Sequence, residues 1–259
     1  MQKITIKKIQ KKKNKTPIIC LTAYSKAIAQ IADKYCDIIL VGDSLGMVLY
    51  GMKTTRNMKI ETMILHAKAV KNHSKRSLVV FDMPYKTYTN KLVAYKNAKK
   101  VMQLTKCDAI KLEGGKKIVN IIKHLTKKKI PVMGHVGLLP QTAINFKVKG
   151  KNLAQKKMIL EDAKAVSNSG AFAIIIECVI ENLAKLITKS ISVPTIGIGA
   201  SKYCDGQILV IDDMLGLSDH YPKFVKQYAN LKNVIEKSIK NYAMEVRLKK
   251  FPYNKNIYK

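Results

Sequence analysis

Short apolar runs alternate with stretches of helical spacing along most of the 259-residue chain. The Ile-rich run at residues 37–41 is typical of a parallel strand that is buried on both faces. Residues 25–35 instead place Ile28, Ile31 and Ala32 on one side of a helix. Eight apolar runs predict strands, at residues 17–24, 37–41, 77–81, 109–112, 131–137, 172–176, 193–198 and 207–211. Helices are predicted at residues 25–35, 60–72, 92–106, 116–128, 154–169, 181–189 and 224–250.

Eight strands that alternate with helices favour an α/β fold of the (β/α)8 TIM-barrel class, and the chain length suits one such barrel. An open doubly wound sheet also alternates, but its GxGxxG fingerprint is absent after the first strand. We therefore predict a single barrel domain over residues 1–259. This prediction includes a basic N-terminal arm at about 1–16, of which residues 7–15 form a solvated helix or arm. It also includes a C-terminal helical extension at about 224–259.

Four of the predicted strands lead straight into an acidic residue: Asp43, Asp82, Glu113 and Glu177. The carboxyl ends of barrel strands meet at one mouth, where barrel enzymes have their active sites. We therefore expect the four carboxylates to gather there. Three of them, Asp43, Asp82 and Glu113, form a candidate site for a divalent cation, and Glu177 is a candidate for proton transfer.

Each acid also has a simpler interpretation when it is taken alone. Asp43 could cap a helix, Asp82 could start a turn, and Glu113 could be an exposed loop acid. Their common position at a strand end favours the metal site. Carboxylates without a cluster of thiolates or histidines suit magnesium, and a structural calcium site is the alternative.

Lys111 lies two residues before Glu113, so both side chains point into the barrel. Lys111 could pair with that acid, bind a substrate carboxylate or form a Schiff base, and carboxylate binding is the interpretation we favour. His135 could polarise a carbonyl or hydrogen-bond a substrate, or it could only satisfy backbone groups. Glu177 follows three isoleucines, an apolar setting that suits a base working near neutrality, although a salt bridge with a lysine is the alternative.

The net charge of +31 raises the alternative of a nucleic-acid-binding protein. However, Arg56, Arg76 and Arg247 are the only arginines, and the lysines are spread over almost every predicted helix and loop. This pattern favours a lysine-coated enzyme surface that follows from codon bias, without specific nucleic-acid binding.

The five cysteines form no CxxC pair, so neither a disulfide framework nor a zinc ribbon is indicated. No apolar run is long enough to span a membrane, and the N-terminal sequence lacks the features of a secretory signal. We therefore expect a cytoplasmic protein.

Six motifs carry a resemblance to a known family, in the order VGDSLGM, KLEGG, GHVGLLPQ, IIIECV, PTIGIGA and DGQILV. In this combination the chain resembles the ketopantoate (3-methyl-2-oxobutanoate) hydroxymethyltransferases from about residue 22 to residue 224. The resemblance implies a barrel of the phosphoenolpyruvate/pyruvate type, a homo-oligomer that is usually a decamer, and a place in pantothenate biosynthesis. It also implies transfer of a one-carbon unit from 5,10-methylenetetrahydrofolate to 3-methyl-2-oxobutanoate, which gives 2-dehydropantoate.

By the same resemblance, Asp43, Asp82 and Glu113 serve the magnesium site, and Glu177 is the proton acceptor. The keto acid is contacted by the side chains at the positions Asp43, Ser44, Asp82 and Lys111. This implication agrees with the chemistry, since magnesium stabilises the enolate that forms when the C3 proton leaves.

The sequence departs from the family pattern in the loop at 144–151, which is a few residues shorter, and at Leu139 and Ser201. The nearest competing function is a magnesium-dependent keto-acid lyase or mutase on the same barrel. Such a lyase is expected to carry a catalytic cysteine in a glycine-rich lid such as KKCGH, and this motif is missing.

Overall fold

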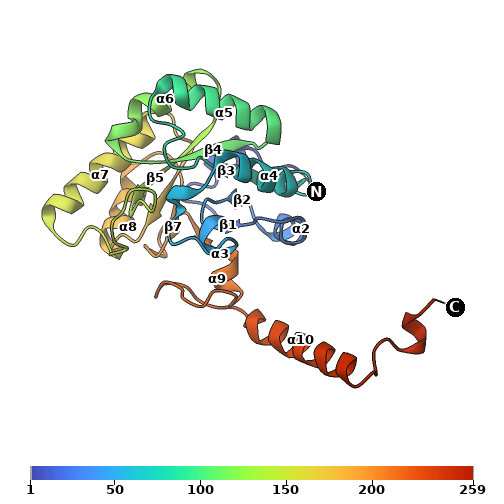
Figure 1. Cartoon of the computed structure of the whole chain (residues 1–259). Helices are drawn as coiled ribbons and strands as arrows, with labels where there is room; N and C mark the ends of the chain where they lie inside the picture. The colour runs from blue at the N-terminus through green and yellow to red at the C-terminus, as the bar shows by residue number, and fades with distance from the viewer. Residues whose placement is uncertain (1, 259) are drawn as a thin grey trace. The chain divides into compact units, whose positions relative to one another are not determined.

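The computed structural model describes residues 2–258 and closes eight parallel strands into a barrel in chain order. Figure 1 shows these strands inside a ring of helices. The strands are β1 (Ile18–Thr22), β2 (Ile38–Val41), β3 (Leu78–Asp82), β4 (Ala109–Glu113), β5 (Val132–Gly137), β6 (Ala173–Glu177), β7 (Thr195–Ile198) and β8 (Gly206–Leu209). The predicted (β/α)8 architecture is therefore confirmed.

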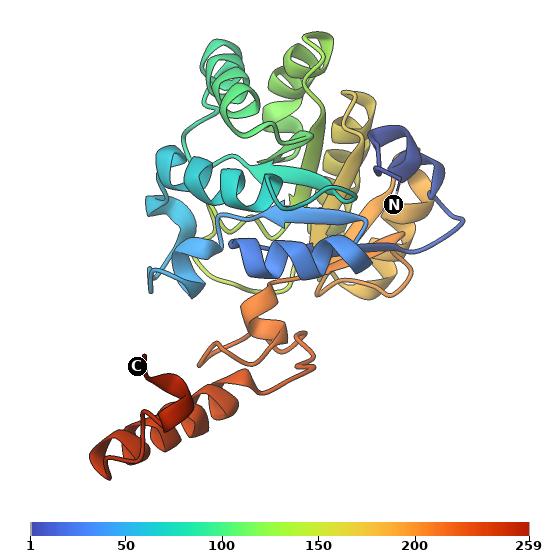
Figure 2. The ribbon, with the colours of Figure 1, turned by 90° about the vertical axis from the view of Figure 1, so that its right-hand side faces the viewer.

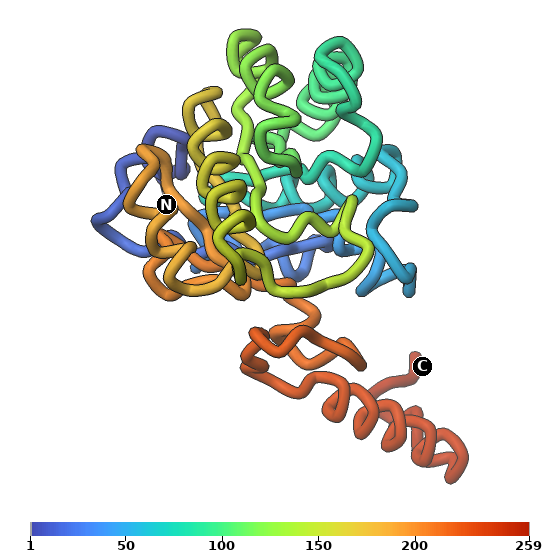
Figure 3. Tube along the Cα trace, turned by 90° about the vertical axis from the view of Figure 1, so that its left-hand side faces the viewer, coloured from blue at the N-terminus to red at the C-terminus, as the bar shows by residue number. Residues whose placement is uncertain are grey.

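Most helices of the barrel follow a strand in chain order, and α1 precedes the first strand. Helices α5 and α6 pack side by side (Figure 3). The helices are α1 (Ile6–Lys11), α2 (Lys26–Tyr35), α3 (Leu45–Val48), α4 (Ile60–Lys71), α5 (Lys91–Thr105), α6 (Val119–Lys127), α7 (Leu153–Asn168) and α8 (Glu181–Ser190). Two 3₁₀ turns complete this part, η1 (Thr55–Asn57) and η2 (Lys116–Ile118).

Polar residues fix where several of these helices begin. The Ser25 side chain accepts from the backbone N–H of Ile28 at the start of α2, and Asn90 accepts from two backbone N–H groups at the start of α5. These caps satisfy amide groups that have no partner inside the helix, which is why Ser and Asn are favoured there. The predicted and observed starts of both helices agree within one residue.

The N-terminal segment covers the amino end of the barrel. Ile9 of α1 is fully buried in the apolar cluster that includes Ile18 and Ile38. Figure 2 shows this blue segment beside α8, where Lys13 donates to the backbone oxygen of Thr188 at 2.6 Å. The predicted helix is present but shorter, and it is not solvated throughout, because one apolar residue among the lysines is drawn into the core.

Ion pairs hold the same segment in place. Three aspartates each precede a strand and accept from the backbone N–H of a neighbouring strand, at 2.8–2.9 Å. Three lysines of the segment bind them at 2.7–2.9 Å: Lys12 binds Asp37, Lys3 binds Asp108 and Lys13 binds Asp205. Part of the lysine excess therefore has a structural use at the amino end of the barrel.

The chain splits into two compact units, Met1–Val210 and Ile211–Lys259. The second unit contains α9 (Ile211–Met214), α10 (Leu231–Arg247) and η3 (Asn254–Asn256). Helix α10 begins later than predicted, because Asn230 caps it by accepting from the N–H of Asn233. None of the helices in residues 2–258 has both the length and the apolarity of a membrane span.

Candidate active site

The four predicted acids lie at the carboxyl ends of their strands. Asp82, Glu113 and Glu177 are the last residues of β3, β4 and β6, and Asp43 follows β2 by two residues. The strand register places Asp82 beside Lys111, Glu113 beside His135, and Glu177 beside Gly137. Parallel pairing therefore brings the candidate residues to one end of the barrel, as the sequence predicts.

Lys111 is the centre of the cluster. Its Nζ donates to both carboxylate oxygens of Asp82, at 2.9 and 3.0 Å, and to Glu113 Oε1 at 3.3 Å. Burial lowers the pKa of Lys111, but the two carboxylates outweigh burial, and the pKa ends well above its ordinary value. Lys111 is therefore an ammonium ion paired with the acids, and a charged amine is unsuited to forming a Schiff base.

The acids around Lys111 differ in how well their charge is compensated. Burial, together with the charge of Asp82, raises the pKa of Asp43 well above its ordinary value. Burial also raises the pKa of Asp82, although Lys111 opposes this. Burial raises the pKa of Glu113 as well, but Lys111 and His135 outweigh it and bring that pKa to about 2. The cluster therefore carries more negative charge than Lys111 alone neutralises.

His135 lies between two acids at the centre of the barrel mouth. Its Nδ1 is 3.5 Å from Glu113 Oε1, and its Nε2 is 3.3 Å from Glu177 Oε2. Neither ring nitrogen has a hydrogen bond of regular geometry. Burial and Lys111 lower the pKa of His135, but the two carboxylates raise it to about 9 overall. The imidazole is therefore a cation that links Glu113 to Glu177.

Glu177 is the most accessible of the four acids, with 15% of its side chain exposed against 2–3% for Asp82 and Glu113. Its ionic partner within the described residues is His135 and not a lysine, unlike the alternative that its sequence context suggested. A carboxylate at the open side of a buried charged cluster has the access that proton transfer to a small substrate requires.

Ser44 lies next to the acids and shares a hydrogen bond with Tyr24. The two hydroxyl oxygens are 2.8 Å apart, and Tyr24 is buried. A tyrosine that donates to Ser44 leaves the serine hydroxyl free to donate to a substrate. Tyr24 had no signal in the sequence pattern beyond its place after the first strand.

The donor set of the acid cluster suits a hard dication. Asp43, Asp82 and Glu113 supply three carboxylates against the single ammonium of Lys111, and the raised pKa values of the two aspartates reflect that imbalance. An added cation would relieve it, so the residues fit magnesium. Within residues 2–258, no three acidic, histidine or cysteine side chains converge closely enough to enclose a metal ion by themselves. Magnesium commonly uses only one or two carboxylates and completes its shell with water and substrate, so this arrangement suits it.

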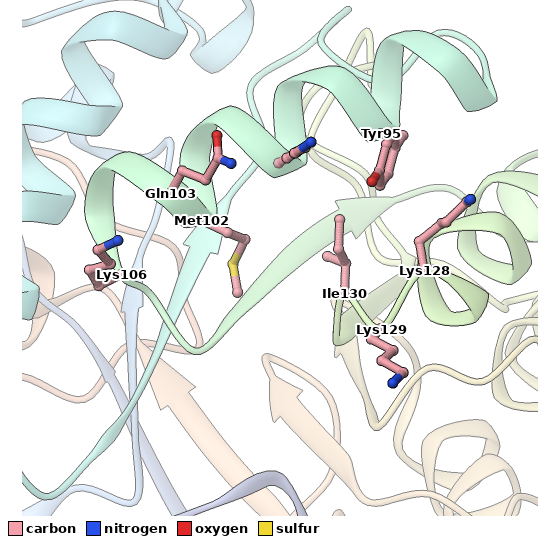
Figure 4. Close-up of a pocket in the computed structure, with 8 residues that line it drawn as sticks. Tyr95, Met102, Gln103, Lys106, Lys128, Lys129 and Ile130 are labelled. Atoms are coloured by element: carbon pink, nitrogen blue, oxygen red, sulfur yellow. The ribbon is translucent and has the colours of Figure 1, made fainter.

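A pocket of about 320 Å³ lies elsewhere, between α5 and the segment that leads into β5 (Figure 4). Its lining includes Tyr95, Met102 and Ile130 and four lysines, Lys99, Lys106, Lys128 and Lys129. Lys106 and Ile130 precede β4 and β5, so this pocket is at the amino ends of those strands, away from the acid cluster. It contains none of the predicted site residues.

A model of the family described as ketopantoate hydroxymethyltransferase matches residues 3–254. The chain belongs to this family. The 3-methyl-2-oxobutanoate hydroxymethyltransferase of Pelagibacter ubique is 55% identical over 248 residues, which cover 96% of both chains. The enzyme of that name from Phenylobacterium zucineum is 47% identical, over all of this chain and 95% of its own.

Solved structures resemble this family member in fold. A phosphonopyruvate hydrolase, solved in complex with oxalate and Mg²⁺, has a TM-score of 0.63 at 12% identity over 99% of this chain and 93% of its own. A 2,3-dimethylmalate lyase of the PEP mutase/isocitrate lyase superfamily has a TM-score of 0.64 at 12% identity over 93% of this chain and 87% of its own. These similarities agree with the barrel fold of this chain.

Two residues that contact the acid cluster were not singled out by sequence reasoning, Gln141 and Tyr88. Gln141 ends the GHVGLLPQ motif, so the motif itself could have pointed to it. Gly137 of the same motif has φ +96°, and a Cβ there would lie 2.4 Å from the backbone oxygen of Glu177. A glycine is needed at this point for β5 to end beside Glu177.

Proposed function

We propose that this chain transfers a hydroxymethyl group from 5,10-methylenetetrahydrofolate to 3-methyl-2-oxobutanoate and forms 2-dehydropantoate. One observation supports this best: Asp43, Asp82 and Glu113 gather with Lys111 at the barrel mouth of a family member, and Glu177 borders them. This pathway step supplies pantothenate, the precursor of coenzyme A.

In the proposed site, Asp43, Asp82 and Glu113 would serve one Mg²⁺ per subunit, with water and the keto acid completing its coordination shell. The bound ion supplies Lewis-acid stabilisation of the negative charge that develops on the keto oxygen. The carboxylates suit this task because Asp43 and Asp82 are buried together and their pKa values are raised, so a cation is the partner that keeps both ionised.

Glu177 takes the proton from C3 of the keto acid. The C–H bond breaks, its electron pair forms the C2–C3 double bond, and the negative charge moves to the C2 oxygen. The partly exposed side chain of Glu177 supports this role, and its contact with His135 Nε2 at 3.3 Å fixes the position of the carboxylate. Water adds its oxygen to the methylene carbon of the folate, both carbon–nitrogen bonds of that carbon break, and the two folate nitrogens take up the protons of the water. C3 attacks the released one-carbon unit, which is at the oxidation level of formaldehyde, and its oxygen takes the proton held by Glu177 and becomes the new hydroxyl group. One water is consumed overall, and tetrahydrofolate is released.

Ser44 and Lys111 hold the substrate carboxylate and so decide which face of C3 is attacked. Tyr24 supports Ser44 because the hydrogen bond between their hydroxyl groups, at 2.8 Å, fixes the position of the serine oxygen. His135 contacts the substrate as well. Its Nε2 lies 3.3 Å from Glu177 Oε2 without a hydrogen bond of regular geometry, so a substrate oxygen bound beside Glu177 can share that N–H.

The domain boundaries, the homo-oligomeric (decameric) assembly and the cytoplasmic location stay predictions. They follow from the sequence patterns and the family resemblance, and small molecules are the expected partners.

The test is product formation by the purified protein. Incubation with 3-methyl-2-oxobutanoate, 5,10-methylenetetrahydrofolate and Mg²⁺ should give 2-dehydropantoate, detected by mass spectrometry. Omitting the folate or chelating the metal should stop the reaction. Product formation that does not depend on the folate would contradict the proposed donor, and the absence of product in the complete mixture would contradict the function.

A further inference from the structure

Gln141 joins the acid cluster through both its side chain and its backbone. Its side chain is buried, at 1% exposure, in the loop after β5. Nε2 donates to Asp43 Oδ2 at 2.9 Å and to the backbone oxygen of Met83 at 3.0 Å. The backbone N–H of Gln141 donates to Glu113 Oε2 at 3.1 Å. One residue therefore binds two of the three acids proposed to hold the metal.

Tyr88 sets the orientation of the Gln141 amide. Its hydroxyl donates to Gln141 Oε1, which leaves Nε2 to face Asp43 and Met83. The reverse orientation of the amide would turn an oxygen toward the Asp43 carboxylate and the Met83 carbonyl, and all of these atoms are acceptors. The Tyr88 hydroxyl accepts from the backbone N–H of Glu113 and offers its own proton to Gln141 Oε1. Together with the acceptors on Asp43 and Met83, it therefore selects the orientation in which Gln141 donates to Asp43.

Arg56 holds the loop that carries Gln141. Its Nε donates to the backbone oxygen of Gln141 at 3.1 Å, and its Nη2 donates to that of Ala143 at 2.7 Å. The Gln141 backbone is therefore tied on one side to Glu113 and on the other to Arg56.

We infer that Gln141 is a positioning residue for the metal-binding carboxylates, oriented by Tyr88. It occupies one oxygen of Asp43 and one of Glu113, and so it restricts rotation of both carboxylates about their last torsion. Lys111 occupies the other oxygen of Glu113. The inference rests on the proposed function, because it assumes that these acids hold a dication. Groups that orient metal ligands in this way typically change affinity when they are removed.

The experiment measures binding of Mn²⁺, a spectroscopically visible ion with similar ligand preferences, in the presence of 3-methyl-2-oxobutanoate. Gln141→Met keeps the length of the side chain and the backbone bond to Glu113 but removes every side-chain hydrogen bond. We expect its Kd for Mn²⁺ to rise by about ten- to a hundredfold. Gln103→Met is the matched control on the exposed surface of α5, and its Kd should equal that of the wild type.

Tyr88→Phe provides the second variant and should raise the Kd less than Gln141→Met does. The double variant Gln141→Met/Tyr88→Phe should bind Mn²⁺ no more weakly than Gln141→Met alone, because Tyr88 acts through Gln141. Thermal unfolding of each metal-free variant, followed by circular dichroism, reports structural damage separately from the Kd.

An unchanged Kd in folded Gln141→Met would overturn the inference and leave the proposed metal site intact. Additive losses in the double variant would overturn the link through Tyr88. If Gln141→Met does not fold, an unchanged Kd in Tyr88→Phe would overturn the oriented-amide role. No Mn²⁺ binding by the wild type would overturn the proposed metal site and this role with it.

Discussion

Replacing Lys111 by methionine removes the ammonium ion from the acid cluster and keeps most of the side-chain volume. Lys111 is 4% exposed, and its Nζ lies 2.9 Å and 3.0 Å from the Asp82 oxygens and 3.3 Å from Glu113. The substitution leaves the neighbouring carboxylates in a buried site without their nearest cation. A divalent metal ion is the natural substitute for the missing charge.

The size of the effect follows from the burial of the pair. Removing one partner of a buried ion pair typically costs about 3–5 kcal/mol, because the remaining charge stays desolvated and unpaired. We expect the free energy of unfolding of Lys111→Met to fall by this amount when metal is chelated. Millimolar Mg²⁺ should recover part of the loss, and it should stabilise the variant more than it stabilises the wild type.

Urea unfolding followed by circular dichroism, with chelator and with Mg²⁺, measures both quantities. The matched control is Lys116→Met, because Lys116 pairs with Glu161 at the surface, where the two side chains are 56% and 39% exposed. Solvent screens such a surface pair, so the control should lose far less stability than Lys111→Met does. A loss below about 1 kcal/mol in Lys111→Met, or no added stabilisation by Mg²⁺, would refute the reasoning.

Three further predictions concern the amino end of the barrel and the acid cluster. Ile9→Ala should lower the free energy of unfolding by about 2–5 kcal/mol, because it opens a cavity at a fully buried position, whereas Ile144→Ala, at 95% exposure, should change it by less than about 0.5 kcal/mol. Equal effects in urea unfolding would contradict the packing of α1 on the barrel. In metal-free protein the folded-state pKa of His135 is about 9, above its ordinary value of about 6.5, so the stability that it contributes is present below pH 6.5 and is lost as the pH rises through 9. The difference in free energy of unfolding between the wild type and His135→Gln should be smaller at pH 9.5 than at pH 6, by at most about 3 kcal/mol. A larger difference at pH 9.5 would contradict this prediction. Asp82→Asn should reduce magnesium-dependent turnover by about a hundredfold or more while the circular dichroism spectrum persists, and retained turnover would remove Asp82 from the metal site.

The barrel was predictable because each strand is a short apolar run, whereas the helices have apolar residues at helical spacing and several begin at a cap residue. The positions of Asp82, Glu113 and Glu177 also followed from the sequence, since each ends an apolar run that became a strand. Parallel strands in chain order bring such ends together without further information.

Contacts between distant loops were not predictable in the same way. Tyr88 and Gln141 are 53 positions apart, and their hydrogen bond depends on how the loops after β3 and β5 meet once the barrel closes. The burial of Ile9 was missed because lysines dominate the segment, although Ile6, three positions earlier, marks the same helix face and also packs against the buried cluster. The late start of α10 was missed, although Asn230 is a regular cap residue, because the preceding segment is also partly apolar.

The most direct measurement of the central claim is exchange of the C3 proton of 3-methyl-2-oxobutanoate in heavy water, followed by NMR without any folate. Wild-type protein should exchange this proton when Mg²⁺ is present and should stop when the metal is chelated. Glu177→Gln should still bind the keto acid but should not exchange the proton, and Glu181→Gln, an exposed neighbouring acid, should behave like the wild type. Rapid exchange by Glu177→Gln would contradict the assignment of Glu177 as the base at the barrel mouth.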